Sequence, residues 1–143
     1  MAILTDDADI RRLLQAARVI AVVGVSTNPE RTSHDIARRV LDAGRWRVHL
    51  VNPVYAGREL FGRPILASLA EVPEPVDIVD VFRRPDAVEP IVKDALAAGA
   101  RAVWFQPGTE NPEVIRRYAD RLDLVTGACL GVMAGRAAGP GAP

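Results

Sequence analysis

The sequence contains a single cysteine, Cys129, among its 143 residues. One cysteine can form no disulfide within the chain and no cysteine-rich metal site, and it fits the reducing cytosol. Long apolar runs are also missing. The longest, Val19 to Val25 and Val48 to Val51, have the length of strands and are far shorter than a membrane span. The acidic N-terminus lacks the basic stretch and long apolar segment of a secretory signal. We therefore expect a cytoplasmic protein that does not enter membranes.

An excess of charge of either sign is absent as well. Lys and Arg together number 18, Asp and Glu also number 18, and the formal net charge is zero. This balance gives no reason to expect a general affinity for nucleic acid, so any anion site must be local. The two histidines, His34 and His49, belong to no Ser-His-Asp set and no metal-ligand spacing. Asp77 and Asp80 are spaced to face opposite sides of one strand. The sequence shows no catalytic constellation, which favours a binding protein over an enzyme.

The length and composition are those of one ordinary globular domain. At 143 residues, with 49% hydrophobic and 25% charged residues, the chain can bury a core without disulfides or metal. We predict a single domain over residues 1–136 and a disordered tail over residues 137–143, whose last five positions are glycine, proline and alanine. A homo-oligomer or an unidentified protein partner stays open.

Strand-like and helix-like segments alternate along the chain. Apolar runs predict strands at residues 19–25, 46–51, 77–82, 101–106 and 122–126. Amphipathic spacing and capping residues predict helices at residues 8–17, 33–43, 68–72, 85–99 and 111–121. The strands are apolar throughout, as in parallel sheets buried on both faces. We therefore predict an α/β fold, a Rossmann-like, doubly wound and mainly five-stranded parallel sheet between helical layers, with its ligand crevice at the carboxyl ends of the strands.

The loop after the first predicted strand is the most informative segment. A strand that leads into a helix through Gly24, Ser26 and Thr27 directs unpaired backbone N–H groups and the positive end of the helix dipole to one spot, which favours phosphate. A dinucleotide-binding fingerprint needs two further glycines at fixed spacing, and neither is present. The loop is thus a phosphate candidate and a poor NAD candidate. Gly24 by itself is equally compatible with a packing role.

The other strand ends supply the remaining candidates, because the carboxyl ends of parallel strands meet at one edge of a sheet. Asn52 and Pro53 end the second strand, where an NAD-binding domain usually has an acidic residue for the ribose diol. Arginines near these ends offer guanidinium groups that match phosphate geometry. The candidate binding residues are Gly24, Val25, Ser26, Thr27, Arg31, Asn52, Pro53, Phe82, Arg83, Arg84, Gln106, Pro107, Gly108 and Cys129.

Several candidates also have a purely structural interpretation, and the residues alone leave both open. Ser26 and Thr27 are suited to cap the following helix. Arg83 and Arg84 precede a proline and fit a solvated helix entrance, and the Asn-Pro pair fits a turn. Cys129 is the one nucleophile, and a thiolate near a helix N-terminus reacts faster, so a mixed disulfide with a thiol ligand is conceivable. The same residue also fits a small buried apolar position.

Four segments together resemble the small single-domain CoA-binding proteins: residues 21–26 (AVVGVS), 51–53 (VNP), 75–83 (PVDIVDVFR) and 103–108 (VWFQPG). That family shares the nucleotide-binding fold of the CoA-binding domain of succinyl-CoA synthetase. The likeness spans residues 13–129, and residues 75–83 are its most specific piece. The resemblance implies coenzyme A, or an acyl-CoA, in the crevice. Residues 24–26 would face the pyrophosphate, residues 52–53 and 82–83 would flank the adenosine, and residues 106–108 with Cys129 would lie towards the pantetheine.

The sequence departs from that family at two places. Many members have Lys or Arg directly after the Asn-Pro pair, and here Val54 follows, so Arg58 or Arg84 would have to bind the 3′-phosphate. Many members also end in Asp-Arg-Cys followed by a Glu-His pair, of which only Cys129 is present here. Non-catalytic binding of CoA is the favoured hypothesis. The alternatives are an NAD(P)-linked oxidoreductase with a degenerate fingerprint, or an interaction subunit with a vestigial nucleotide site.

Overall fold

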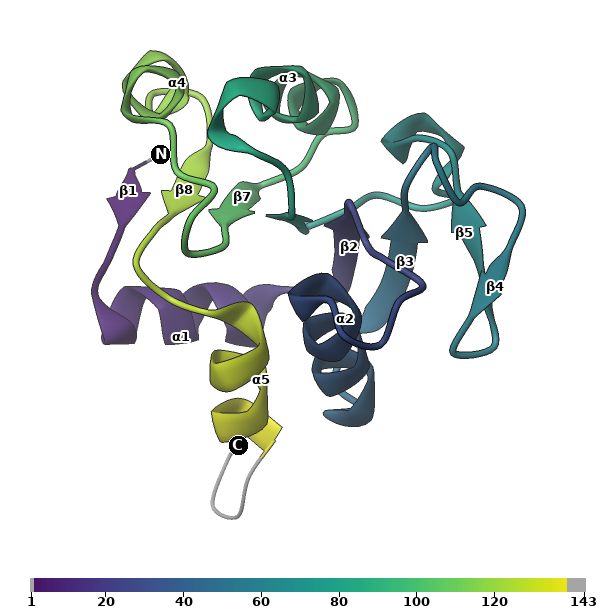
Figure 1. The fold of residues 1–143 in the computed structure, drawn as a ribbon. Helices are drawn as coiled ribbons and strands as arrows, with labels where there is room; N and C mark the ends of the chain where they lie inside the picture. The colour runs from purple at the N-terminus through teal and green to yellow at the C-terminus, as the bar shows by residue number, and fades with distance from the viewer. Residues whose placement is uncertain (1, 139–143) are drawn as a thin grey trace.

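The computed structural model describes residues 2–138, which form one eight-stranded sheet flanked by helices (Figure 1). The strand order is β1-β8-β7-β6-β2-β3-β5-β4, and every neighbouring pair is parallel except β4 with β5. The strands are β1 (Ile3–Leu4), β2 (Val19–Val23), β3 (Arg47–Val51), β4 (Glu59–Leu60), β5 (Arg63–Leu66), β6 (Ile78–Val81), β7 (Ala102–Phe105) and β8 (Asp123–Val125). The helices are α1 (Asp7–Ala16), α2 (Thr32–Asp42), α3 (Glu89–Ala97), α4 (Pro112–Tyr118) and α5 (Leu130–Ala138), with short 3₁₀ helices η1 (Leu69–Glu71) and η2 (Pro85–Ala87).

Helices cover both faces of the sheet, with α1, α2 and α5 on one face and α3 and α4 on the other (Figure 1). Strand β2 shows why the sequence folds this way. All five of its residues are buried, and successive side chains of a strand point to opposite faces. Ile20 and Val22 pack under α1, α2 and α5, whereas Ala21 and Val23 pack under α3 and α4. A strand with two buried faces has to be apolar throughout, as the sequence of β2 is.

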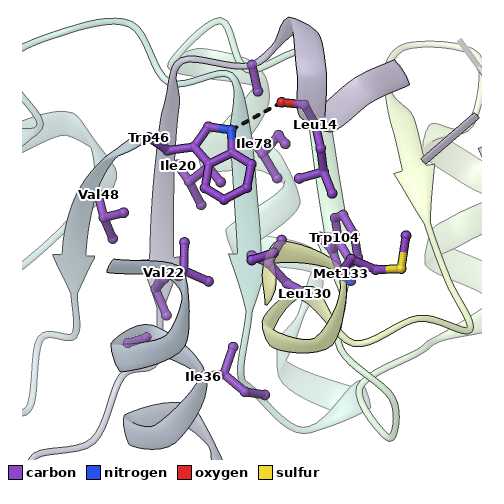
Figure 2. Packing of buried hydrophobic residues seen from close by; sticks show 14 of the residues in the cluster. Leu14, Ile20, Val22, Ile36, Trp46, Val48, Ile78, Trp104, Leu130 and Met133 are labelled. Atoms are coloured by element: carbon purple, nitrogen blue, oxygen red, sulfur yellow. Dashed lines mark hydrogen bonds between the residues drawn. The ribbon is translucent and has the colours of Figure 1, made fainter. Parts of the chain in front are cut away.

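Trp46 joins the first of these two cores to α1. Its indole Nε1 donates a hydrogen bond to the backbone oxygen of Leu14, 3.1 Å away (Figure 2). The ring packs in the same cluster as Ile20, Ile78 and Trp104. Full burial of side chains of this size stabilises the fold by about 1.5–3 kcal/mol each.

The chain reverses its direction of travel across the sheet at β2. From β2 it moves outward to β3 and β5, then returns to β6 on the other side of β2 before continuing to β7 and β8. Helix α2 follows β2 on one face, and α3 follows β6 on the opposite face. Because the two connections diverge, a crevice opens at the carboxyl ends of β2 and β6, as expected at the switch point of a doubly wound sheet.

The predicted α/β, doubly wound architecture is confirmed, and all five predicted strands are present. The expected strand number was too low, because β1, β4 and β5 extend the sheet at its two edges. Strands β1 and β4 contain two residues each, too few to produce a periodic pattern. The predicted helix at residues 68–72 is the 3₁₀ helix η1, with the capping box of Ser68 and Glu71 in place.

Helix α5 was not predicted, because Gly131 and Gly135 lower the helix propensity of its sequence. Gly131 has a packing reason, since a β-carbon there would lie 3.2 Å from side-chain atoms of Ile36 and Arg39 on α2. Helix α5 includes positions 137 and 138 of the predicted tail, and residues 139–143 lie outside the described residues. Within residues 2–138, no helix is long and apolar enough to cross a membrane, and no three His, Cys, Asp or Glu side chains gather into a metal site.

Candidate ligand-binding site

A crevice of about 820 Å³ opens at the carboxyl ends of β2, β3, β6 and β7. The segments that follow these strands form its walls, as the topology requires. Pockets of this size hold small-molecule ligands and cofactors. The lining residues are Gly24, Ser26, Asn52, Val54, Tyr55 and those at positions 30–33, 82–85 and 107–109.

Gly24 forms the turn at the end of β2, at the floor of the crevice. Its φ of +94° lies in a region that side-chain-bearing residues rarely adopt. Its backbone N–H donates to the carbonyl of Val51 at the end of β3, at 2.8 Å. A β-carbon at position 24 would lie 2.3 Å from the backbone oxygen of Phe82. The packing role of this glycine is therefore real, and it brings the ends of three strands together.

The loop between Gly24 and α2 is held by its own hydrogen bonds. The Ser26 N–H donates to the Ser33 hydroxyl at 3.0 Å, and the Ser26 hydroxyl accepts from the Asn28 N–H at 3.0 Å. The His34 ring lies 3.1 Å through Nδ1 from the Ser26 carbonyl. Helix α2 itself has Arg31 as its N-cap, without a side-chain hydrogen bond to the first turn. The interpretation of Ser26 and Thr27 as helix caps is therefore wrong.

The N-terminus of α2 faces the crevice, because Arg31, Thr32 and Ser33 all belong to the lining. The first N–H groups of a helix have no partner within the helix, and here no side chain caps them. The helix dipole places a partial positive charge at the same point. This arrangement is suited to bind an anion, and phosphate above all.

Arginines add formal positive charge to the same walls. Arg31, Arg83 and Arg84 line the crevice, and Glu30 is the acidic residue among the lining side chains. Arg84 Nε lies 3.4 Å from an Asp86 carboxylate oxygen, but both side chains are largely exposed, so the pair is weak. Arg58 is not in the lining, although its guanidinium lies 5.7 Å from the centre of the ring of Tyr55, which is. Of the two arginines considered for the 3′-phosphate, Arg84 is the one that lines the crevice.

Asn52 ties two walls of the crevice together. Its side-chain Nδ2 donates to the Val25 carbonyl at 2.8 Å, and its Oδ1 accepts from the Val54 N–H at 2.9 Å. The second bond is the local turn that the Asn-Pro pair suggested. Asn52 is buried, so its amide holds the β3 end against the phosphate loop.

A smaller cavity of about 280 Å³ adjoins the crevice on the α3 side and shares Gly24, Asn52 and Arg83 with it. Its wall combines the strand ends with η1 and α3, and includes the apolar residues Val23, Pro53, Val51, Leu69, Pro90 and Ile91. Arg83 and Asp94 are the charged residues of this wall, so a group with an apolar body and polar edges fits the cavity better than a charged one, since charge is costly to bury.

Gln106 and Cys129 form a separate arrangement, outside the lining of these two cavities. The Gln106 Oε1 accepts from the Leu130 N–H at 2.9 Å, and its Nε2 donates to the Cys129 Sγ at 3.6 Å. Gln106 is buried. It fastens the start of α5 to the end of β7.

The other candidates from the sequence fall into three groups. Gly24, Ser26, Arg31, Asn52, Phe82, Arg83, Arg84, Pro107 and Gly108 line the crevice, and Pro53 lines the smaller cavity. Val25 is fully buried in the core, so only its backbone can reach a ligand, and Thr27 lies outside both linings. The candidate set omitted Thr32, Ser33, Tyr55 and Thr109, although the predicted helix start near Thr32 and Ser33 was the signal for the first two.

The doubly wound, mostly parallel sheet with a crevice at its switch point defines a Rossmann-like α/β protein. A family model described as a CoA binding domain matches residues 18–135, and the chain belongs to that family.

Similar proteins support the same family assignment. An uncharacterized protein of Bacillus subtilis (strain 168), YneT, is 36% identical over 114 residues, covering 80% of this chain and 82% of its own. A Thermus thermophilus structure superposes with a TM-score of 0.83 at 38% identity, over 92% of this chain and 98% of that one. The dinucleotide forming acetyl-coenzyme A synthetase 1 of Ca. Korarchaeum cryptofilum, in complex with phosphate and ADP, matches with a TM-score of 0.69 at 28% identity. The match covers 83% of this chain and 27% of the synthetase chain.

Proposed function

We propose that the protein binds coenzyme A or an acyl-CoA in the 820 Å³ crevice and releases it chemically unchanged. The observation that carries the proposal is the uncapped N-terminus of α2, which faces the crevice together with Arg31, Arg83 and Arg84. Coenzyme A carries a pyrophosphate and a 3′-phosphate, so it requires two anion contacts a nucleotide's length apart. The membership of the CoA-binding-domain family supports the same ligand.

The pyrophosphate would lie on the loop from Gly24 and on the first turn of α2. Thr32 and Ser33 present the free N–H end of the helix there, and Arg31 brings a guanidinium to the same wall. The internal hydrogen bonds of Ser26 keep the loop in shape before any ligand arrives. A preformed site avoids the entropic cost of ordering a loop on binding.

The adenosine would lie between the ends of β3 and β6, against the smaller cavity. Its apolar wall suits a flat base, and Arg83 borders both cavities. Arg84, on the wall next to Arg83, would bind the 3′-phosphate that Val54 cannot bind. No acidic residue follows β3, so a phosphorylated ribose meets no repelling carboxylate at that strand end.

The contacts of the two histidines support the non-catalytic part of the proposal. The His34 ring bonds to the Ser26 carbonyl, and His49 Nε2 lies 2.7 Å from a Glu74 carboxylate oxygen. Both rings thus have structural partners. Catalysis by either would require it to leave that partner.

Isothermal titration with CoA, dephospho-CoA, NADH and NADPH tests the proposal. We expect CoA to bind, dephospho-CoA to bind more weakly, and neither dinucleotide to give heat. CoA recovered from the complex should have its original mass. Tight binding of NADPH with no heat from CoA would instead support the oxidoreductase. No heat of binding from any of the four ligands would support an interaction subunit.

A further inference from the structure

The turn between β4 and β5 contains an unusual residue. Phe61 and Gly62, its two central positions, have φ values of 55° and 74°. A two-residue hairpin turn with positive φ at both positions strongly favours Asn-Gly, because asparagine tolerates the left-handed region far better than phenylalanine does. Among residues 2–138, Phe61 is the one residue other than glycine with a positive φ. A backbone cost of this kind persists where a contact of the side chain compensates for it.

The Phe61 ring contacts His34, which lies in the first turn of α2. The two ring centroids are 4.8 Å apart and the ring planes make an angle of 61°, an edge-to-face arrangement that aromatic pairs prefer. Phe61 is 36% exposed and belongs to neither of the two core clusters. Burial in the core therefore does not explain a phenylalanine at this turn, whereas the contact with His34 does.

His34 also bonds to the loop between Gly24 and α2. Its Nδ1 lies 3.1 Å from the Ser26 carbonyl oxygen. A carbonyl oxygen can only accept, so this hydrogen bond requires the proton on Nδ1. Ser33, the neighbour of His34 on α2, accepts from the Ser26 N–H at 3.0 Å. The first turn of α2 therefore holds both backbone groups of Ser26.

The bond from His34 fixes the orientation of one peptide unit of the loop. The Ser26 carbonyl and the Thr27 N–H belong to the same planar trans peptide, so they point in opposite directions. Ser26 lines the crevice and is 9% exposed. Without the bond, this carbonyl would be left unpaired at a nearly buried position, which favours rotation of the peptide. A carbonyl oxygen that turned towards the crevice would repel a phosphate.

We propose that His34, supported by Phe61, is a positioning residue of the anion site, because it holds the Ser26 carbonyl on α2 and away from the ligand. The contact of Phe61 with His34 is called the brace below. Through the brace, the tip of the β4–β5 hairpin contributes to the affinity of a crevice that it does not line. The effect on affinity rests on the proposed function, whereas the hydrogen bond itself is measured without a ligand.

The ring nitrogens of His34 test the hydrogen bond in the protein alone. Two-dimensional ¹H–¹⁵N NMR of the neutral ring shows which nitrogen carries the hydrogen, and we expect Nδ1. His49 is the only other histidine, so the spectrum of His34→Asn assigns the signals. A hydrogen on Nε2 of His34 would overturn the proposal, because an Nδ1 without a hydrogen cannot donate to Ser26.

Two substitutions separate the hydrogen bond from the ring contact. His34→Asn keeps a side-chain N–H donor close to the backbone and loses the ring, whereas His34→Phe keeps a ring and loses the donor. Calorimetry should show that CoA affinity falls about tenfold in His34→Phe and by no more than about threefold in His34→Asn. An equal or larger loss in His34→Asn would contradict the proposal, as would unchanged affinity in His34→Phe.

Phe61→Asn tests the brace. The variant gives the turn its preferred residue, so the melting temperature should hold or rise, yet CoA affinity should fall about threefold because the His34 ring loses its support. A merely structural role would change stability and affinity together. Val132→Asn, at an exposed apolar position outside the lining, is the control and should bind CoA as before. Unchanged affinity in Phe61→Asn would show that the brace has no such role.

Failure of the proposed function would be recognised separately, because the natural protein would then bind no CoA. The NMR spectrum of Phe61→Asn decides on the brace in that case. We expect a larger share of the His34 ring with its hydrogen on Nε2 than in the natural protein, since the ring no longer faces Ser26 in one fixed orientation. An unchanged share would overturn the brace.

Discussion

The backbone oxygen of Phe82 lies 2.3 Å from the point where a β-carbon on Gly24 would stand. The end of β6 thus approaches the turn after β2 as closely as a glycine permits. Because β2 and β6 are neighbours at the switch point of the sheet, this contact forms the floor of the crevice. The close approach explains why position 24 is a glycine, the first of the dinucleotide fingerprint.

Gly24→Ala should destabilise the fold by about 3 kcal/mol, since it combines a strained φ with a clash against backbone. Gly57→Ala is the matched control. Its φ of +89° is just as unfavourable for alanine, but nothing lies within 4 Å of the added carbon, so about 1 kcal/mol should be lost. Urea unfolding measures both. Equal losses would show that the approach of Phe82 is unimportant.

Thr32→Glu should separate helix stability from ligand binding. A carboxylate in the first turn of α2 favours the helix by about 0.5 kcal/mol, so the melting temperature should hold or rise. The same charge repels the pyrophosphate, and CoA affinity should fall at least about tenfold, or 1.4 kcal/mol. Thr5→Glu makes the same change just before α1, away from the crevice, and should leave CoA binding unaltered. Equal affinity of the two variants would move the phosphate site elsewhere.

Arg84→Ala should weaken CoA binding about tenfold and leave dephospho-CoA binding nearly unchanged, because only CoA has the 3′-phosphate. Arg58→Ala, on the Tyr55 ring, is the control and should bind both ligands as before. Calorimetry gives the four affinities. A selective loss in the Arg58 variant instead would reverse the assignment.

Asp80 should make the protein less stable as the pH rises. Burial raises its pKa in the folded state, so its stabilising contribution is complete below about pH 4 and declines as the pH rises through the folded-state pKa. The free energy of unfolding should fall relative to Asp80→Asn by up to about 1.4 kcal/mol for each pH unit in that window. Parallel curves of stability against pH for the two proteins would mean that Asp80 ionises as easily in the fold as in the unfolded chain.

Glu74 should have the opposite pH dependence. Hydrogen bonds from His49 and Arg47 lower its pKa, so its contribution is present above about pH 4.5 and is lost as the pH falls through the folded-state pKa. Glu74→Gln should therefore be less stable than the natural protein near pH 6 and should approach it near pH 3. Glu59→Gln, at an exposed position, is the control. A difference that persists undiminished at pH 3 would contradict this linkage.

The sequence predicted the fold best in strands whose two faces are both buried, because such strands accept only apolar residues. Strand β2 is apolar throughout because both of its faces are covered, and such a run has few other interpretations. The β4–β5 hairpin has no such apolar run, and residues 62–65 suggested only a short extension of the sheet. Its turn places Phe61 at φ 55°, a conformation that the sequence would not suggest for phenylalanine. Helix α5 was not predicted because Gly131 lowers helix propensity. The reason for a glycine at this position is the packing of α2 side chains against it, which the sequence does not show.

The site was predictable to the extent that it follows strand ends. Arg83, Asn52 and Pro107 line the crevice because topology alone places such positions at one edge of a sheet. Gln106 satisfies the same rule and still turns inward, because the Leu130 N–H requires an acceptor. The burial of Asp80 without a hydrogen-bond partner among residues 2–138 could not be predicted either. It depends on what three helices place over one strand, and no local pattern encodes that.

The most direct test of the proposed binding site is an amide NMR titration of the full chain with CoA. We predict that the largest shifts will fall on the backbone N–H groups of Thr32 and Ser33, with further shifts at Gly24 and Gly108. Amides in the groove between α2 and α5, around Gly131, should not move. Shifts concentrated there, or no shifts under saturating CoA, would contradict a phosphate site at the N-terminus of α2.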